Sequence, residues 1–340
     1  MILHLTRKEK FTKPFIDFIK ENFNINDHFF LLVGGTNKRE FYIDDDFCIK
    51  SINNIKDFIK YFIEFNIKMY KSKKIIIHGL SQPYCIFYLF FNPWLIKKCY
   101  WIMWGGDFYF PEKQGWIKKQ VIRKINNFIS VNNKDMAYAI NNYQISPKNI
   151  FYSQFYPTCI ASCEMVESDC VDTQTIKILV GNSSTKENRH KDVFGILERY
   201  KNDDIEIIVP LSYGDEKYKN ETMVLGRSIF GDKFNPIVDF MDFEEYKKML
   251  QSVDIGIFVQ NRQQAGANIK LLAGYGKKLY ISKENSFYNL LTDDGIRVYD
   301  IENFELKKIE KEISDTNKKI SLEKYSLDSL IKSWVEILKA

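Results

Sequence analysis

The feature of this sequence that most constrains its fold is a regular alternation of short apolar runs with segments of helical periodicity. The runs are four to six residues long, which suits strands buried on both faces of a parallel sheet. In the first half the predicted strands are 2–5, 29–33, 74–78, 99–104, 128–131 and 150–153. In the second half they are 176–180, 205–209, 237–240, 255–259 and 278–281. Strands that alternate with helices predict an α/β protein with doubly wound parallel sheets.

Helix-like segments separate these strands, and one stretch between the halves has no periodicity. The helices are predicted near 13–22, 55–69, 83–91, 116–126, 134–141, 189–201, 215–230, 243–252, 267–275, 285–291 and 322–338. The stretch 158–175 is rich in polar and acidic residues and is the natural boundary. We therefore expect an N-terminal domain over residues 1–165 and a C-terminal domain over residues 172–340, facing each other across a cleft, with the terminal helix able to pack back on the N-terminal domain. A chain of 340 residues accommodates two such domains.

The charge of the chain is divided unevenly between its halves. Residues 1–170 hold 23 of the 49 basic and 16 of the 44 acidic side chains, so their net charge is +7, against −2 for the remainder. A basic half suggests an anionic partner, a membrane or a nucleic acid; drift of composition toward lysine explains it equally well. Four basic pairs lie among aromatic residues, which suits an anionic bilayer interface, although a solvated helix face explains any single pair. These pairs are Lys73-Lys74, Lys97-Lys98, Lys118-Lys119 and Arg123-Lys124.

Cysteine spacing and hydropathy bear on where the chain resides. Its six cysteines include no C-x-x-C pair, a pattern typical of free thiols in a cytosolic protein. The apolar residues at the start precede the basic ones, which is the reverse of a signal peptide. The longest apolar stretch, 84–96, is too short to span a bilayer. A chain of this kind that meets a membrane is expected to lie on its surface. The cysteines are Cys48, Cys85, Cys99, Cys159, Cys163 and Cys170.

One strand-to-helix junction of the second half has the composition of a phosphate-binding loop. Gly181, Asn182 and Ser183 follow the predicted strand 176–180, and Asn188 and His190 open the next helix. Small residues let backbone N–H groups approach a phosphate, and the helix dipole favours an anion there. An ordinary strand-to-helix turn prefers the same residues, so both interpretations stay open.

A second junction lies on the same edge of the predicted sheet. Arg262, Gln263, Gln264 and Gly266 follow the strand 255–259, and Tyr213 lies in a third loop of that edge. The Arg262 guanidinium can fork onto phosphate oxygens, and the Gly266 region can supply backbone amides. Two such loops in one domain indicate a phosphate site more specifically than one. Neither loop is a P-loop or a G-x-G-x-x-G motif, so ATP and NAD lose their usual sequence support.

The first half offers two candidates for acid–base chemistry. His78 ends one predicted strand, and Asp107 follows the next strand after two glycines. A carboxylate among Trp and Tyr suits a general base, because apolar surroundings raise its pKa. A turn or capping role for Asp107 and a buried hydrogen-bonded side chain for His78 are the simpler alternatives. The run Asp44-Asp45-Asp46 is better explained as a solvated turn than as a metal site, and no other cluster implies a required metal.

Taken in order, several segments resemble the bacterial 4-acetamido-4,6-dideoxy-D-galactose transferases of glycosyltransferase family 56. The W-x-x-W-G-x-D-x-Y block at 101–109 and the G-N-S block at 181–183 carry most of the specificity. The chain departs from the family in the residues after R-Q-Q, which are Ala265-Gly266-Ala267-Asn268, and in its poorly matching first 70 residues. The matching segments, which span roughly 75–287, are 77–79, 101–109, 178–183 with Asn188 and His190, 209–210 with Tyr213, and 262–264.

The resemblance implies a GT-B fold, in which two Rossmann-like domains face each other across a cleft. It implies a metal-independent, inverting transfer from a dTDP-activated deoxyamino sugar to a polyprenyl-pyrophosphate-linked saccharide, in O-antigen or enterobacterial common antigen synthesis. It also implies a peripheral place on the cytoplasmic face of the bacterial inner membrane. The nucleotide would lie in the C-terminal domain, with Asp107 as the first candidate base and His78 as the second.

No cofactor and no nucleic acid are expected as partners, while an anionic membrane surface is. Two rival functions stay open at this stage. One is a nucleotide-sugar epimerase of the same fold, which would need no acceptor. The other is a non-catalytic protein that binds sugar nucleotides.

Overall fold

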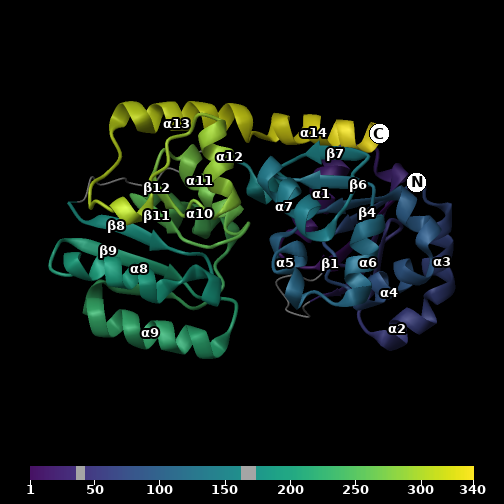
Figure 1. The fold of residues 1–340 in the computed structure, drawn as a ribbon, viewed down its shortest axis with the longest axis horizontal. Helices are drawn as coiled ribbons and strands as arrows, with labels where there is room; N and C mark the ends of the chain where they lie inside the picture. The colour runs from purple at the N-terminus through teal and green to yellow at the C-terminus, as the bar shows by residue number, and fades with distance from the viewer. Residues whose placement is uncertain (36–42, 162–173) are drawn as a thin grey trace. The chain divides into compact units, whose positions relative to one another are not determined.

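The computed structural model describes residues 1–35, 43–161 and 174–340, which form two compact units. Unit 1 comprises Met1–Thr158 and Leu330–Ala340, and unit 2 comprises Cys159–Ser329. Each unit contains one fully parallel sheet with helices packed on it (Figure 1), so the predicted α/β class with doubly wound sheets is confirmed. Cys163, Cys170 and most of the predicted boundary lie outside the described residues. The remaining cysteines, Cys48, Cys85, Cys99 and Cys159, are free thiols.

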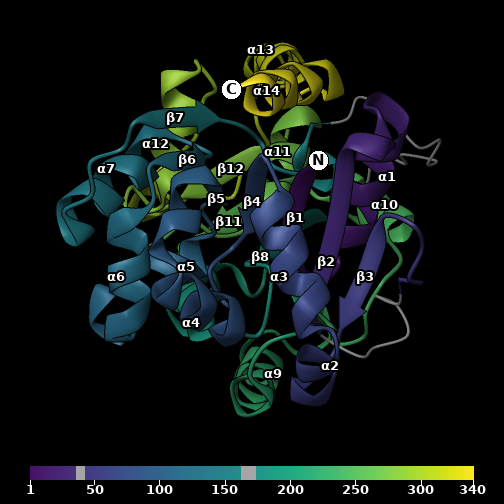
Figure 2. The same cartoon turned by 90° about the vertical axis from the view of Figure 1, so that its right-hand side faces the viewer.

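Unit 1 has a seven-stranded sheet in the order β3-β2-β1-β4-β5-β6-β7. Figure 2 shows β3, β2, β1 and β4 side by side. The chain runs outward from β1 to β3 and then returns to place β4 on the other side of β1. The strands are β1 (Ile2–Lys8), β2 (His28–Gly35), β3 (Ile49–Ile52), β4 (Lys74–His78), β5 (Cys99–Ile102), β6 (Asn127–Ser130) and β7 (Asn149–Tyr152). The helices are α1 (Thr12–Asn22), α2 (Ile55–Lys60), α3 (Phe62–Lys71), α4 (Pro83–Phe91), α5 (Gly105–Phe108), α6 (Trp116–Lys124) and α7 (Asn133–Tyr143).

Two details of unit 1 differ from the sequence-based expectation. Strand β3 was not predicted, because its four residues include Lys50 and Ser51 and are too short to display a pattern. The single helix predicted over 55–69 is two helices, since the backbone of Tyr61 leaves the helical region between α2 and α3.

The last helix of the chain, α14 (Leu327–Lys339), completes unit 1. Its Trp334 is fully buried against Phe15, and the indole N–H donates to the Phe155 carbonyl at 3.0 Å. The ammonium of Lys74 donates to the carbonyls of Ile337 and Leu338, where a cation offsets the negative end of the helix dipole. The terminal residues are therefore fixed by packing and by a buried cation.

Unit 2 has a five-stranded sheet in the order β10-β9-β8-β11-β12. Its apolar core lies on the buried faces of these strands, around Ile207 and Ile257. The strands are β8 (Ile176–Val180), β9 (Ile205–Pro210), β10 (Phe234–Ile237), β11 (Ile255–Phe258) and β12 (Lys278–Ile281). The helices are α8 (His190–Leu197), α9 (Glu216–Phe230), α10 (Phe243–Ser252), α11 (Gly266–Gly274), α12 (Ser286–Asp293) and α13 (Lys311–Lys324).

Two predicted elements of the second half are corrected by the structure. The strand expected at 237–240 lies at Phe234–Ile237, where the edge position of β10 tolerates Pro236 and its missing N–H. The terminal helix expected at 322–338 is divided between α13 and α14. The helix is interrupted at Tyr325, whose carbonyl accepts a hydrogen bond from Ala161 N and whose hydroxyl donates to Asp294. In the part of the chain that the structure describes, no helix combines the length and apolarity needed to span a bilayer.

Candidate functional site

The turn after β8 in unit 2 is built so tightly that it requires glycine. Gly181 has φ of +69°, a conformation that side-chain-bearing residues rarely adopt. A Cβ at this position would lie 2.6 Å from Oδ1 of Asn188 and 3.1 Å from Nε2 of His190. The backbone of Gly181 therefore lies directly against these two side chains.

A network of side-chain amides holds this turn against the neighbouring loops. Asn188 Oδ1 accepts from Asn182 N at 3.0 Å and from Gln260 Nε2 at 2.7 Å, and its Nδ2 donates to Ser183 O at 2.9 Å. Asn182 Nδ2 donates to the Tyr213 hydroxyl at 2.9 Å, and Asn182 Oδ1 accepts from Gln264 at 3.1 Å. The structure thus brings the predicted residues Asn182, Ser183, Asn188, Tyr213 and Gln264 into one connected cluster.

His190 brings a buried donor to this turn. The residue is 1% exposed, and burial lowers the pKa of its imidazole to about 4, so the ring is neutral at pH 7. The Tyr218 hydroxyl lies 3.2 Å from both the His190 backbone nitrogen and the ring Nδ1. If that hydroxyl accepts from the backbone N–H and donates to Nδ1, the ring proton resides on Nε2. Within the described residues Nε2 has no hydrogen-bond partner, and an unpaired buried donor costs about 1–3 kcal/mol.

The second predicted loop leads into the N-terminus of α11. Ala265 precedes the helix with φ of +62°, an unusual conformation for a residue with a Cβ, and makes no side-chain cap. Gly266 begins the helix where a Cβ would lie 2.3 Å from the Phe287 ring. A helix start without a cap leaves backbone N–H groups available to an anion. Arg262 donates to the carbonyl of the buried Gln263 at 3.2 Å in the same loop.

Sequence reasoning missed Gln260, which links these two loops. Its side chain is fully buried; it donates to Asn188 and its Oε1 accepts from Asn285 at 3.4 Å. The signal was its position two residues after β11, at the carboxyl edge.

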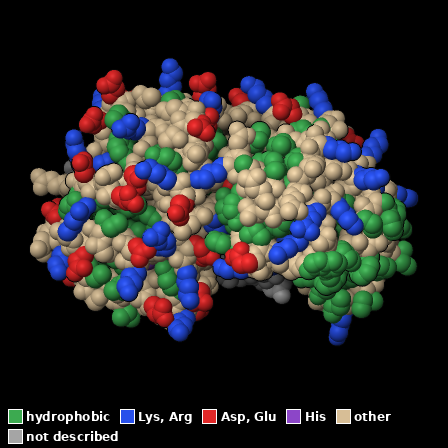
Figure 3. Space-filling model, viewed as in Figure 1, with side chains coloured by type: hydrophobic (Ala, Val, Ile, Leu, Met, Phe, Trp, Pro, Cys, Tyr) green, Lys and Arg blue, Asp and Glu red, His purple; other side chains and the backbone are tan. Residues whose placement is uncertain are grey.

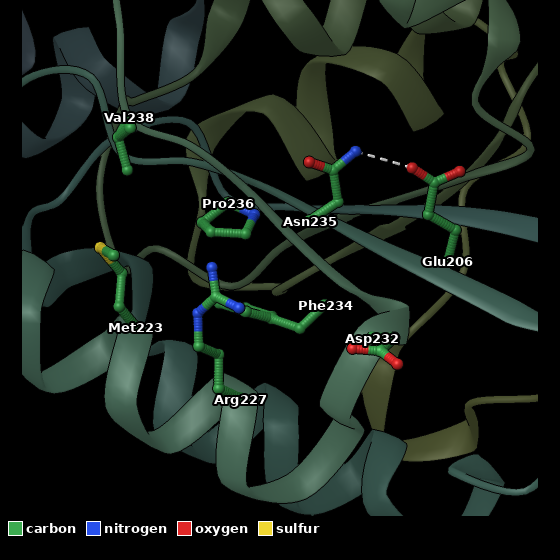
Figure 4. Close-up of a pocket in the computed structure, with 8 residues that line it drawn as sticks. All are labelled: Glu206, Met223, Arg227, Asp232, Phe234, Asn235, Pro236 and Val238. Carbon is green, nitrogen blue, oxygen red and sulfur yellow. Dashed lines mark hydrogen bonds between the residues drawn. The ribbon is translucent and has the colours of Figure 1, made fainter.

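A surface pocket of about 410 Å³ in unit 2 is lined by none of the predicted donor residues. Figure 4 shows Met223 and Arg227 of α9 on one side of it and Asn235 and Pro236 of the edge strand β10 on the other. The pocket is therefore separate from the cluster of loops after β8 and β11.

The predicted base Asp107 of unit 1 is engaged in internal contacts. It lies in α5, directly after β5, and is 4% exposed. Its Oδ2 accepts from Leu80 N at 2.7 Å, and its Oδ1 lies 3.5 Å from the ammonium of Lys118. Burial raises the pKa of this carboxyl and the Lys118 charge opposes the shift. Asp107 therefore joins the turn after β4 to helix α6 in addition to lying at the predicted edge.

His78, the second candidate base, belongs to a chain of three buried histidines. Its Nε2 lies 3.1 Å from His4 Nδ1, and His4 Nε2 lies 2.9 Å from His28 Nδ1. At the other end, His78 Nδ1 lies 3.0 Å from the hydroxyl of Tyr156. Burial lowers the pKa of His78 to about 3 and that of His28 to about 4, and holds the pKa of His4 well below its usual range. All three imidazoles are therefore neutral at pH 7.

In each basic pair of unit 1, one member makes a hydrogen bond or ion pair with another residue of the unit. Lys98 donates to the carbonyls of Tyr70 and Ser72, and Arg123 Nε donates to that of Tyr143. Lys74 and Lys118 are held by the contacts given above. Lys73, Lys97 and Lys124 are exposed and Lys119 is half-buried. Only one member of each predicted pair is thus without such an internal contact.

The aspartate run is part of a turn. Asp45 accepts from Ser51 N and Asp46 from Cys48 N, each at 2.8 Å. Among residues 1–35, 43–161 and 174–340, no group of three or more His, Cys, Asp or Glu side chains is arranged to hold a metal ion.

Helices α2, α3 and α4 of unit 1 expose an unusual amount of apolar side chain, here named the apolar surface. Figure 3 shows apolar side chains gathered over these helices. Ile63 is 75% exposed, and Trp94 joins α3 through a 3.0 Å hydrogen bond to the Tyr70 hydroxyl. The apolar surface consists of Ile55, Ile59, Phe62, Ile63, Ile67, Tyr70, Tyr84, Phe87, Phe91, Trp94 and Trp116.

Residues 12–339 match the model of a protein family described as 4-alpha-L-fucosyltransferase, glycosyl transferase group 56. The match extends over nearly the whole chain and both units. It agrees with the family that the sequence motifs resemble.

Solved glycosyltransferases share the architecture at low sequence identity. A glycosyltransferase from Rickettsia africae is 14% identical, with a TM-score of 0.67 over 99% of this chain and 97% of its own. Alr3699/HepE from Anabaena, solved with UDP and glucose, is 10% identical, with a TM-score of 0.71 over 99% of each chain. WaaG, a glycosyltransferase of lipopolysaccharide biosynthesis, is 10% identical, with a TM-score of 0.57 over 99% of this chain and 93% of its own. The two Rossmann-like sheets and these likenesses confirm the predicted GT-B fold.

Proposed function

The chain belongs to glycosyl transferase group 56 and is a glycosyltransferase, and from this premise we propose the reaction that it catalyses. A deoxyamino sugar of the 4-acetamido-4,6-dideoxygalactose type is transferred from a dTDP-sugar to a polyprenyl-pyrophosphate-linked saccharide. The transfer is inverting and serves bacterial surface polysaccharide synthesis, as O-antigen or common antigen, on the cytoplasmic face of the inner membrane. The lipopolysaccharide role of WaaG is consistent with such a pathway.

The donor-binding part of the proposal rests on the loops after β8 and β11 in unit 2. His190 Nε2 is buried there without a partner among the described residues. The uncapped start of α11 adds backbone amides, and Arg262 adds a cation. Hydrogen-bond donors around one turn suit a diphosphate, whose charge grows as the sugar leaves.

No divalent metal is required in this proposal. The leaving diphosphate is stabilised by Arg262, His190 and the amides at the start of α11, which are already in place before the reaction. Turnover in excess EDTA should therefore equal turnover with added Mg²⁺ or Mn²⁺. Loss of turnover in EDTA that either metal restores would contradict this part of the proposal.

The acceptor side of the reaction is assigned to unit 1 and to an anionic membrane surface. The apolar surface carries eleven large exposed side chains, including Trp94 and Trp116, the residue type that favours the interfacial region of bilayers. Lys56, Lys60, Lys71 and Lys97 are exposed on the same helices or directly beside them. Apolar side chains with lysines nearby fit insertion among anionic lipids, where a lipid-linked acceptor resides.

Calorimetry with dTDP tests the donor site. Arg262→Ala should weaken dTDP binding by roughly 1.5–3 kcal/mol, the usual loss for a charge-assisted contact. Arg227→Ala, in the pocket of Figure 4, is the matched control and should leave the affinity unchanged. Equal dTDP affinity in both variants would contradict the proposal that the nucleotide binds at these loops.

One incubation separates the proposed reaction from its rivals. The chain is mixed with a dTDP-sugar and a lipid-linked saccharide, and the nucleotide, sugar and lipid products are analysed. Transfer releases dTDP and lengthens the lipid-linked saccharide. An epimerase would alter the sugar without needing the lipid, and a binding protein would leave both unchanged.

A further inference from the structure

The strand order of unit 1 reverses between β1 and β4, although all the strands are parallel. From β1 the chain proceeds to β2 and β3 on one side, and β4 then lies on the other side of β1. At such a point the loops after the two strands diverge, and ligands of open α/β sheets bind in the crevice that this leaves. The loops concerned follow β1, which ends at Lys8, and β4, which ends at His78.

Glu9 is the first residue after β1 and is therefore at this point. Its side chain is 28% exposed, so it is only partly buried. Arg7 Nε lies 3.4 Å from Glu9 Oε1 and forms a hydrogen bond neither with it nor with any other described residue. The other end of the Arg7 guanidinium, Nη1, lies 3.4 Å from Ser81 Oγ in the loop after β4. Arg7 thus connects Glu9, in the loop after β1, to the loop after β4, while leaving the carboxylate able to accept a proton.

The other two candidate bases lack this combination. Both oxygens of Asp107 face internal partners, Leu80 N and the Lys118 ammonium. Both ring nitrogens of His78 face internal partners, His4 and Tyr156. A substrate hydroxyl would have to displace these contacts to reach either group.

We propose that the Glu9 carboxylate is the general base that accepts the proton of the acceptor hydroxyl. As that proton moves to Glu9, the hydroxyl oxygen forms a bond to the anomeric carbon of the donor sugar. The bond from that carbon to the phosphate oxygen breaks, and its electron pair leaves with the nucleoside diphosphate. The proton then passes from Glu9 to solvent. This assignment rests on the proposed transferase function and names its proton acceptor.

The charges around Glu9 suit this task. Burial raises the pKa of the carboxyl, and the charge of Asp107 adds to the effect, while Arg7 and Lys10 oppose it. A base whose pKa lies nearer to the working pH accepts a proton more readily in the transition state. Asp107 therefore affects Glu9 through its charge.

The test compares Glu9→Gln with a matched control, Glu21→Gln, which alters an exposed glutamate of α1. Glu9→Gln should lower kcat by about 10²–10⁴-fold, while the dTDP affinity and melting temperature stay at wild-type values. Glu21→Gln should retain wild-type kcat. The fall of wild-type kcat/KM on the acid side, where Glu9 becomes protonated, should be absent from the residual activity of Glu9→Gln.

Formate or azide added to Glu9→Ala should restore part of the turnover, because either ion can accept the proton in the vacated space. Near-normal kcat in Glu9→Gln would overturn the assignment. So would lost activity in Glu9→Gln and Glu9→Ala that neither ion restores, together with an unchanged acid limb. If wild-type protein releases no dTDP with any lipid-linked acceptor, the proposed function itself fails, a result distinct from an active Glu9→Gln variant.

Discussion

The carboxyl edges of the two sheets differ in how their polar residues are paired. In unit 2 the edge is a neutral network of amides, Asn182, Asn188, Gln260 and Gln264, with a buried donor on His190 left over. In unit 1 the edge is built from ionisable groups, and most of these are paired with one another. An edge with unused donors suits an anion that arrives with the substrate. This edge holds the buried Asp107 carboxylate and the neutral His78, from which the histidine chain extends through His4 in β1 to His28 at the start of β2. Such an edge suits a fixed scaffold around one accessible base.

The largest expected effect is that acid lowers the free energy of unfolding of unit 1. His28 and His78 have folded-state pKa values of about 4 and about 3, below the value of about 6.5 in an unfolded chain. The unfolded state therefore binds more protons below pH 6.5, so stability is present above that pH and is lost toward pH 4. At pH 5 each of these two histidines costs about 2 kcal/mol, and His4 acts in the same direction.

Urea unfolding at pH 7.5 and 5 measures this loss through tryptophan fluorescence. All five tryptophans, Trp94, Trp101, Trp104, Trp116 and Trp334, lie in unit 1. His190→Asn removes the single histidine of unit 2 and should leave the shift of the unit 1 midpoint unchanged. Equal midpoints at the two pH values would mean that the histidine chain is charged or hydrated in the folded protein.

Asp107→Ala should show that the buried carboxylate holds unit 1 together. The change leaves the Lys118 ammonium, whose side chain is 13% exposed, without its counter-ion and Leu80 N without its acceptor. Removing one partner of a buried ion pair typically lowers the free energy of unfolding by about 3–5 kcal/mol. Urea unfolding measures the loss. The double variant Asp107→Ala with Lys118→Met should recover part of it. Unchanged stability with lost turnover would instead return Asp107 to the general-base role that the sequence predicts.

The sequence predicts more of the carboxyl edge of unit 2 than of the carboxyl edge of unit 1. The loop after β8 is contiguous, so Gly181, Asn182 and Ser183 directly follow a strand and carry their own signal. Gln260 was not predicted because a glutamine in a loop can have many roles. Only its hydrogen bonds with Asn188 and Asn285 show that it links the two loops.

The residues of unit 1 depend on distant partners. Lys118 opposite Asp107 and Tyr156 opposite His78 are separated from them by many residues and carry no local pattern. Only the strand order shows that Glu9 lies where the order of the sheet reverses. That order could not be predicted without β3, which is short and half polar. The fold class followed from periodicity, since buried parallel strands are apolar throughout.

His190→Ala should test the unused donor of unit 2. The variant should bind dTDP about 10–100-fold more weakly, which corresponds to about 1.5–3 kcal/mol for a hydrogen bond to a charged group. Tyr218→Phe keeps the imidazole but removes the hydroxyl that lies 3.2 Å from its Nδ1, so a smaller loss is expected. Calorimetry measures both. Wild-type affinity in His190→Ala would mean that its Nε2 meets no phosphate, and the anion would then be bound by the start of α11 and Arg262.

The smallest effect concerns the outer surfaces of the two units. Ile63 in the apolar surface of unit 1 is 75% exposed, and Val224 on α9 of unit 2 is 72% exposed. Exposed apolar residues scattered singly are ordinary, whereas a contiguous patch indicates a binding surface. Ile63→Ser should weaken co-sedimentation with anionic vesicles by about five-fold, since partial insertion of one isoleucine contributes about 1 kcal/mol. Val224→Ser removes a similar exposed side chain and should leave vesicle binding unchanged. Both variants should melt at the wild-type temperature, because neither side chain is buried in the folded protein.

A higher salt concentration should weaken vesicle binding by the wild-type protein and by both variants, because salt screens the charges of the nearby lysines. The difference between the two variants should remain, because salt leaves apolar burial intact. Equal loss in both variants would assign membrane binding to the chain's charge instead of to the apolar surface.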